Sequence, residues 1–136
     1  MANSVTTQLI LDGPRNCVVK FEGILDTSDL GSTVVLNPAL LVGMDNTGTQ
    51  KAAKLRITDI NYAIEDGLAI NLFWDATTPE RIESLTGRGE REYEDFGGLV
   101  NNAGAGVTGI ISATSQGWAA AGILSFSLII QCTKQQ

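Results

Sequence analysis

The chain has 136 residues and a mass of 14.4 kDa, which suits one domain, because chains divide into two domains mostly beyond roughly 250 residues. Hydrophobic residues make up 43% and charged residues 18%, so the chain is too apolar and too weakly charged for disorder. Histidine is absent, which removes the commonest general base and zinc ligand and any nucleophile activated by histidine. We therefore expect no enzyme activity, no metal site and no cofactor.

Acidic residues outnumber basic ones by fifteen to nine, and the net charge is −6. Nucleic-acid binding needs a basic face, so the scattered lysines and arginines predict no direct contact with DNA or RNA. The two cysteines, Cys17 and Cys132, lie in apolar runs and indicate buried thiols rather than a disulfide framework. The start of the chain lacks the charged and apolar segments of a secretory signal. We expect the protein to stay in a reducing cytoplasm or in an assembly built there.

Turn residues recur along the chain, and the short runs between them are rich in Val, Ile, Thr and Phe. This rhythm predicts an all-β domain of many short strands. The first two strands are expected at 5–11 and 16–22, joined by a turn at 12–14. In the second, alternate residues from Cys17 to Phe21 share one face, as in a half-buried strand.

A weaker strand is expected at 31–36. It must end before Pro38, because the residue before proline avoids the helical region and proline cannot donate to a sheet. The apolar run at 38–42 fits either a helical turn or an irregular loop.

The runs at 54–64 and 68–74 read as a hairpin, because Asp66-Gly67 between apolar alternations favours a tight turn. The apolar positions of the first run change parity near Thr58-Asp59. One extra residue there would restore a single apolar face, so we predict a β-bulge.

The segment from Thr78 to Leu85 is predicted to be a short helix, with an early proline, an early glutamate and two apolar residues three apart. Gly87 would end it. The charged run at 88–95 reads as a strand or arm that faces solvent or pairs with charges on a neighbour.

From Phe96 to Gln136 the only charged side chain is Lys134. Strands are expected at 107–115 and 122–133 within this uncharged third. Exposed antiparallel surfaces are usually studded with charge. Either the chain's own strands bury this third as a central hairpin, or another subunit covers part of its surface.

The stretch from Gly104 to Gly109 matches the G-x-G-x-x-G fingerprint, and Asn101-Asn102-Ala103-Gly104 resembles a stretch of short-chain dehydrogenases. Both matches lack their context, which needs a following helix and an acidic residue about 20 positions on. Neither tyrosine has a lysine four residues later. These missing features argue against dehydrogenase function, and the glycines predict a turn with positive φ.

Glu80 with Glu83, and Glu92 with Glu94, could in principle do acid/base work, but their neighbours are arginines and solvated charge is the expectation. The segment 45–48 suggests a calcium loop only superficially, because the downstream glutamate is missing.

The apolar stretch 118–130 is shorter than the ~20 residues that cross a bilayer, so no membrane partner is expected. Both tryptophans fit core filling, but tryptophan is also favoured at the buried centre of interfaces. Trp118, beside the small residues 119–121 in the uncharged third, is the better interface candidate.

Three segments of the chain resemble small virion structural proteins of tailed bacteriophages: LDGPRNCVVKFEGILDTSDL, FWDATTPERIESLTGRGEREYEDFGGLVNNAGAG and SQGWAAAGILSFSLII. The resemblance covers most of the chain and carries no catalytic signature. It implies a place in a virion, and several small β proteins of this kind are capsid decoration, or cement, proteins.

We therefore expect one domain over 1–136: an antiparallel β-sandwich, jelly-roll-like, with one short helix. The expected function is that of a homo-oligomeric capsid decoration protein, which binds the major capsid protein on the capsid surface, after assembly in the host cytoplasm, and stabilises the head. A tail or neck/connector structural protein, or a carbohydrate- or receptor-binding β-sandwich, is the alternative. The candidate interface residues are Trp118, Ile123, Ile129, Trp74, Arg88 and Arg91.

Overall fold

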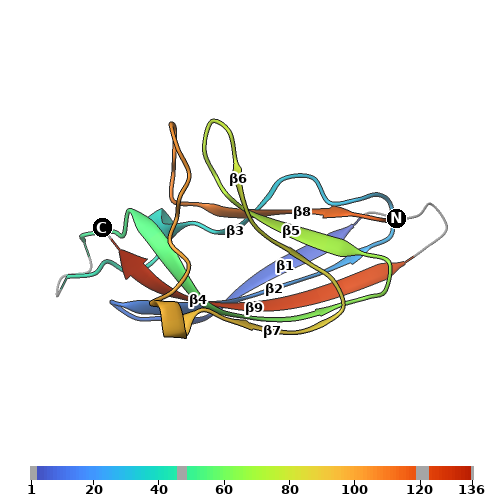
Figure 1. Cartoon of the computed structure of the whole chain (residues 1–136), viewed down its shortest axis with the longest axis horizontal. Coiled ribbons are helices and arrows are strands. Elements are labelled where there is room, and N and C mark those ends of the chain that lie inside the picture. The colour runs from blue at the N-terminus through green and yellow to red at the C-terminus, as the bar shows by residue number, and fades with distance from the viewer. Residues whose placement is uncertain (1–2, 46–48, 119–122, 136) are drawn as a thin grey trace.

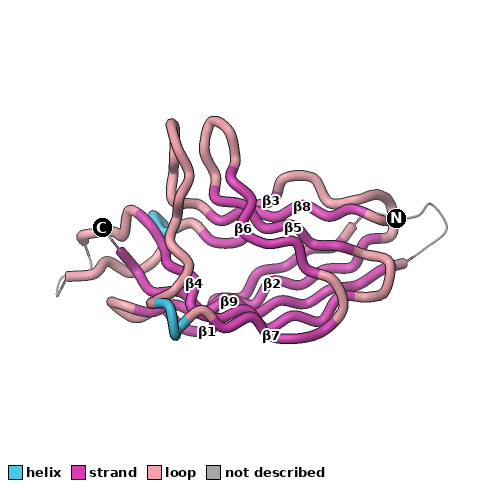
Figure 2. Tube along the Cα trace, in the orientation of Figure 1, coloured by secondary structure: helices cyan, strands magenta, loops and turns pink. Residues whose placement is uncertain are grey.

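The computed structural model describes residues 3–45, 49–118 and 123–135. Antiparallel strands pair into a five-stranded sheet, β1-β2-β9-β4-β7, and a four-stranded sheet, β3-β8-β5-β6. The two sheets form the layers of a sandwich (Figures 1 and 2). The strands are β1 (Ser4–Asp12), β2 (Asn16–Leu25), β3 (Thr33–Leu36), β4 (Lys54–Ile64), β5 (Ala69–Trp74), β6 (Glu80–Leu85), β7 (Arg88–Glu92), β8 (Ile111–Gln116) and β9 (Leu124–Gln135), with 3-10 turns η1 (Pro38–Leu40) and η2 (Glu94–Phe96).

The strand pairing is nested. β5 pairs with β6, β4 with β7, β3 with β8 and β2 with β9, all antiparallel. A long hairpin folded over on itself in this way is a jelly roll, so the predicted architecture is confirmed. Strand β1 lies outside these four pairs and adds a fifth strand beside β2.

The core lies between the inner faces of the two sheets. Alternate residues of β2 from Cys17 to Leu25 point into it, as the two-residue alternation in the sequence predicts. Phe21 packs against Phe126 of β9, with ring centroids 5.3 Å apart. Gly23 faces the Phe126 ring at a distance that leaves no room for a Cβ atom, so this aromatic packing requires glycine.

The predicted β-bulge in β4 is confirmed. The register of β4 against β9 shifts between Ile57 and Asp59, so Ile57 before the shift and Ile60 after it are both fully buried. Thr58 is held by two hydrogen bonds: its hydroxyl donates to the Gln131 carbonyl, and its own carbonyl accepts from the Tyr93 N–H. The extra residue keeps one apolar face and turns Asp59 to the outer face of the sheet.

The predicted hairpin between 54–64 and 68–74 is wrong, although its turn is correct. The Leu68 N–H donates to the Glu65 carbonyl across a tight turn, and Gly67 has φ = 88°. The strands on either side belong to different sheets, since β4 pairs with β9 and β7, and β5 with β6 and β8. Turn residues determine only that the chain reverses. The chain passes here from one sheet to the other because the apolar faces of both sheets must be buried against each other.

The predicted helix at 78–85 is also wrong, because 80–85 forms β6. The register of β5 against β6 shifts so that Leu72 lies opposite Glu83 and Phe73 opposite Arg81. Ile82 is therefore the extra residue of a bulge. In a regular strand, side chains on one face are two residues apart, and a bulge locally makes this separation three. Ile82 and Leu85 therefore have the three-residue separation that is typical of one face of a helix.

The uncharged strands β8 and β9 are both interior strands of their sheets. β8 lies between β3 and β5, and β9 between β2 and β4. They do not form the expected hairpin with each other, but their lack of charge follows from burial by the chain's own strands. The outcome favours self-burial for these two strands.

Lys134, the one charge of this third, is buried. Its side chain is 0% exposed, and Nζ donates to Asp12 Oδ1 at 2.6 Å and to the Val42 carbonyl at 2.6 Å. Asp12 Oδ2 also accepts from the Val42 N–H. The ion pair thus ties the end of β9 to the β1–β2 turn and to the segment after η1.

The two cysteines are free, buried and directly opposite each other on β2 and β9. A hydrogen bond from Cys132 lowers the pKa of Cys17, and donating that bond raises the pKa of Cys132. The expectation of two buried thiols is confirmed.

Replacing Lys134 with methionine should lower the free energy of unfolding by about 2–4 kcal/mol, because Asp12 keeps its charge but loses its buried partner. The double variant Asp12→Asn/Lys134→Met removes both charges and should recover part of that loss. Urea unfolding of the three proteins measures both effects. A Lys134→Met protein as stable as the parent would contradict the role of this ion pair.

Candidate functional site

The structure places the predicted interface residues in different environments. Trp74 is 1% exposed, so the expectation that it contacts a partner is corrected: it fills the core between the sheets. Ile123 is 65% exposed, and Arg88 and Arg91 are exposed on β7. Ile129 is half-buried on β9.

Trp118 is anchored to its own chain. Its indole Nε1 donates to the Leu25 carbonyl at 3.0 Å, and its backbone N–H donates to Asp29 Oδ1 at 3.0 Å. The ring is half-buried against the core. These contacts give Trp118 a structural role in the single chain. The alanines at 119–121, which supported its interface role, lie outside the described residues.

Strand β1 is an open sheet edge with almost no charge. Asp12 at its end is its only charged residue, and the strand is exposed along most of its length. Leu9, Ile10 and Leu11 are each about half exposed. A register shift between Leu9 and Leu11 makes Ile10 a bulge, so the regular edge runs from Ser4 to Leu9. An edge strand offers unpaired N–H and C=O groups to another chain.

The other sheet edges differ from β1. β7 reads Arg-Gly-Glu-Arg-Glu, β6 carries two glutamates and an arginine, and β3 has four residues. Charge and shortness are the usual protections of an edge against pairing. The contrast singles out β1 as the edge that is left open, a feature already visible in the uncharged run 4–11.

Two loops stand out from the four-stranded sheet and lie side by side (Figure 1). One joins β5 to β6, and the other precedes β8. They are joined by hydrogen bonds from the Thr77 N–H to the Ala105 carbonyl and from the Thr108 hydroxyl to Asp75. Gly106 and Gly109 have φ of 78° and 84°, so the glycine-rich stretch is a turn with positive φ, as predicted, and strand β8 rather than a helix comes next.

Apolar side chains are also exposed in the segment between β7 and β8. Phe96, at the end of η2, is 80% exposed, and Val100 is 48% exposed. These side chains belong to the uncharged third and are not covered by the chain's own strands. This part of the uncharged third keeps the second interpretation open, that another subunit lies against it.

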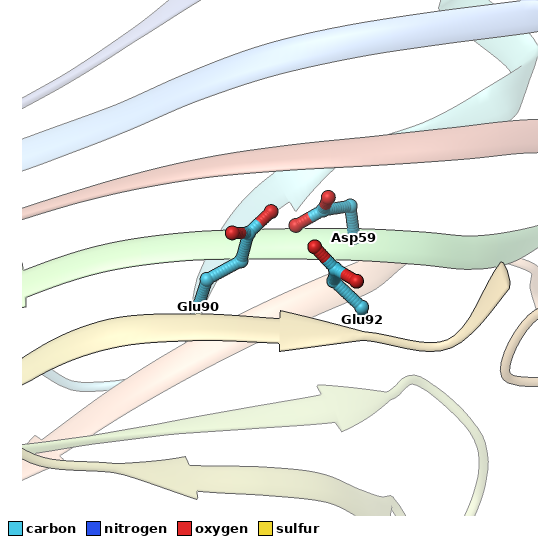
Figure 3. A group of neighbouring side chains, drawn as sticks. All are labelled: Asp59, Glu90 and Glu92. Carbon is cyan, nitrogen blue, oxygen red and sulfur yellow. The ribbon is translucent and has the colours of Figure 1, made fainter.

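Three carboxylates converge on the outer face of the five-stranded sheet (Figure 3). Asp59 of β4 lies opposite Glu92 of β7, and Asn61 of β4 lies opposite Glu90. One carboxylate oxygen from each acidic residue lies within 4.8 Å of the others. The sequence places Glu92 beside Glu94 and gives no sign of this group, because only the bulge and the β4–β7 register bring Asp59 to it.

Asp59 differs from its two exposed neighbours. It is 7% exposed, and its Oδ1 has no hydrogen-bond partner. A protonated Glu90 can donate a hydrogen bond to Asp59, and this bond is the main reason why the pKa of Glu90 is raised above its usual range. Desolvation and the negative charge of Asp59 contribute smaller effects in the same direction. A proton or a cation between the three groups would relieve their mutual repulsion.

No protein-family model and no curated protein sequence matches the chain. Among solved structures, it is similar to a cupin superfamily protein from Desulfitobacterium hafniense DCB-2, with a TM-score of 0.36, 12% identity, and coverage of 100% of this chain and 82% of the other. A likeness this weak says nothing of activity. Within the described residues, no helix has the length and apolar character needed to cross a membrane.

We predict that Trp118→Ala destabilises the isolated protein by about 2–4 kcal/mol, since it removes a half-buried ring and its hydrogen bond to Leu25. Ile123→Ala is the matched control: this exposed side chain should change stability by less than about 0.5 kcal/mol. Thermal or urea unfolding separates the two. Equal stability of Trp118→Ala and the parent would return Trp118 to the interface candidates.

Proposed function

We propose that the chain is a non-enzymatic virion structural protein, a capsid decoration protein that binds the major capsid protein and stabilises the head. The resemblance to small phage virion proteins motivates the proposal. The observation that carries it is the open, uncharged edge of β1, which contrasts with the charged or short edges elsewhere. Such an edge can accept an extended segment of another protein as an added strand.

Strand addition suits a protein that must hold neighbours together. Main-chain hydrogen bonds supply the attraction, and the uncharged side chains of 4–11 avoid repulsion between partners. Each copy buries a modest area, but many copies that clamp adjacent capsomers must release together, so the assembly gains from avidity. The net charge of −6 disfavours adhesion to the packaged nucleic acid.

The aromatic side chains count against carbohydrate binding. All eight lie in the described residues, and Phe96 alone among them is mostly exposed, while Phe21, Trp74 and Phe126 are buried. A glycan site normally needs stacked aromatic rings around a polar cleft. A hollow of about 460 Å³ on the outer face of the five-stranded sheet is lined by Ser4, Thr6, Glu22, Arg88 and Ser127 among others, and its one aromatic side chain, Phe126, is buried.

Binding to capsids prepared without this protein tests the function. We expect saturable binding with hundreds of copies per particle, whereas a ring in a tail or neck would hold about six or twelve copies. Quantitative mass spectrometry of particles gives the copy number, and the mass of the free protein in solution tests the expected homo-oligomer. No binding to capsids, tails or necks would overturn the proposal.

The variant Thr6→Lys/Gln8→Glu tests the role of the β1 edge. Thr6 lies opposite Glu22 and Gln8 opposite Lys20, so each new charge faces an opposite charge, the net charge is unchanged and the fold should persist. Charge on the edge should weaken capsid binding by roughly tenfold or more.

The matched control for this variant is Thr86→Lys/Thr78→Glu, which adds the same two charges at exposed positions away from β1. We expect it to bind capsids like the parent. Equal binding by the control and the β1 variant, with both folded, would show that the partner does not use this edge.

A further inference from the structure

The group formed by Asp59, Glu90 and Glu92 has no role in the proposed capsid contact. Its three ligand atoms come from two neighbouring strands and lie within 4.8 Å of one another. Alternation along β7 turns Arg91, between the two glutamates, to the opposite face, where it lies opposite the buried Ile60. Neither ion pair found among the described residues, Lys20–Glu22 or Lys134–Asp12, involves this group.

The buried member of the group points to a missing partner. Asp59 is 93% buried, and its Oδ1 is shielded from solvent and accepts no hydrogen bond. In Figure 3 its carboxylate is directed toward those of Glu90 and Glu92. A buried carboxylate oxygen without a donor is costly, and the carboxylates of Glu90 and Glu92 lie within 4.8 Å of an oxygen of Asp59. A cation at their meeting point would satisfy all three.

We propose that Asp59, Glu90 and Glu92 bind a divalent cation of the calcium type. The donors are all carboxylate oxygens, which suit hard cations rather than zinc or copper. Ca²⁺ accepts six to eight oxygens at irregular angles, and water can supply the rest because both glutamates are exposed. Mg²⁺ requires a near-octahedral arrangement with shorter bonds, so it should bind less tightly.

The cation would fasten the edge of the sheet. Among the described strands β7 pairs with β4 alone, and all five of its residues are exposed. Without a cation, three neighbouring negative charges repel one another across the β4–β7 pair. With a cation, the same charges join the two strands. The site is therefore expected to couple divalent-cation concentration to the stability of this edge, independently of what the β1 edge binds.

Calorimetric titration of the full chain with CaCl2, after removal of metal with EDTA, tests the site. We expect one Ca²⁺ per chain with Kd of about 0.1–1 mM, the range of modest surface sites, and at least roughly tenfold weaker binding of MgCl2. At a free Ca²⁺ concentration about tenfold above Kd, the Tm should rise by roughly 3–6 °C.

Asp59→Asn keeps the shape of the side chain and should reduce Ca²⁺ affinity at least tenfold. In EDTA this variant should melt no lower than the parent, because it removes one repelling charge. Asp95→Asn is the matched control: it removes an exposed carboxylate near β7 but outside the group, and should bind Ca²⁺ like the parent.

Should Asp59→Asn fail to fold, Glu92→Gln provides the same test from the exposed strand. The proposal fails if folded parent protein neither binds Ca²⁺ nor gains Tm, which would mean that a proton alone holds the three carboxylates together. It also fails if Asp59→Asn or Glu92→Gln retains the affinity of the parent.

Discussion

The register of β4 is the constraint on which much of this molecule depends. The strand must bury Leu55 and Ile57 at one end and Ile60 and Ile64 at the other, on one face, although these positions have opposite parity. One extra residue at Thr58 satisfies this requirement. The same residue ends the regular pairing between β4 and β7 and turns Asp59 outward to face the glutamates of β7. Core packing and the carboxylate group thus share one cause.

Sequence patterns predicted most of the strands, because each half-buried strand alternates with a period of two. They predicted the bulge at 58–59 for the same reason. They did not predict which strands pair. The turn at Asp66-Gly67 is as tight as expected, but whether a reversal joins two strands of one sheet or crosses between layers is decided by distant partners. The bulge at Ile82 explains why a helix was predicted where β6 lies. A strand with one extra residue has apolar positions three apart, as a helix does.

For the candidate sites, too, the sequence reveals local features but not which strands lie next to one another. The lack of charge along β1 is local information and could be read from residues 4–11, but its meaning depends on β1 lying at an edge outside the four nested strand pairs. Asp59 and Glu90 meet only through the β4–β7 register, which no spacing in the sequence reveals. From the sequence, Trp74 and Trp118 each fit either the core or an interface. The structure distinguishes them: Trp74 is buried in the core, whereas the Trp118 indole is hydrogen-bonded to the Leu25 carbonyl at the end of β2.

The position of β9 has a consequence for how the chain is made. Residues 124–135 are synthesised after the other strands of the two sheets, yet they lie in the middle of the larger sheet, where Asn16 meets Thr133, 117 positions further along the chain. The β1–β2 hairpin therefore leaves the ribosome long before its neighbour exists, with the apolar side of Phe21 open to water. Closing so long a loop is slow, and nascent chains in this interval are exposed to aggregation and to chaperones. Translation speed through the later strands should then influence the yield of native protein.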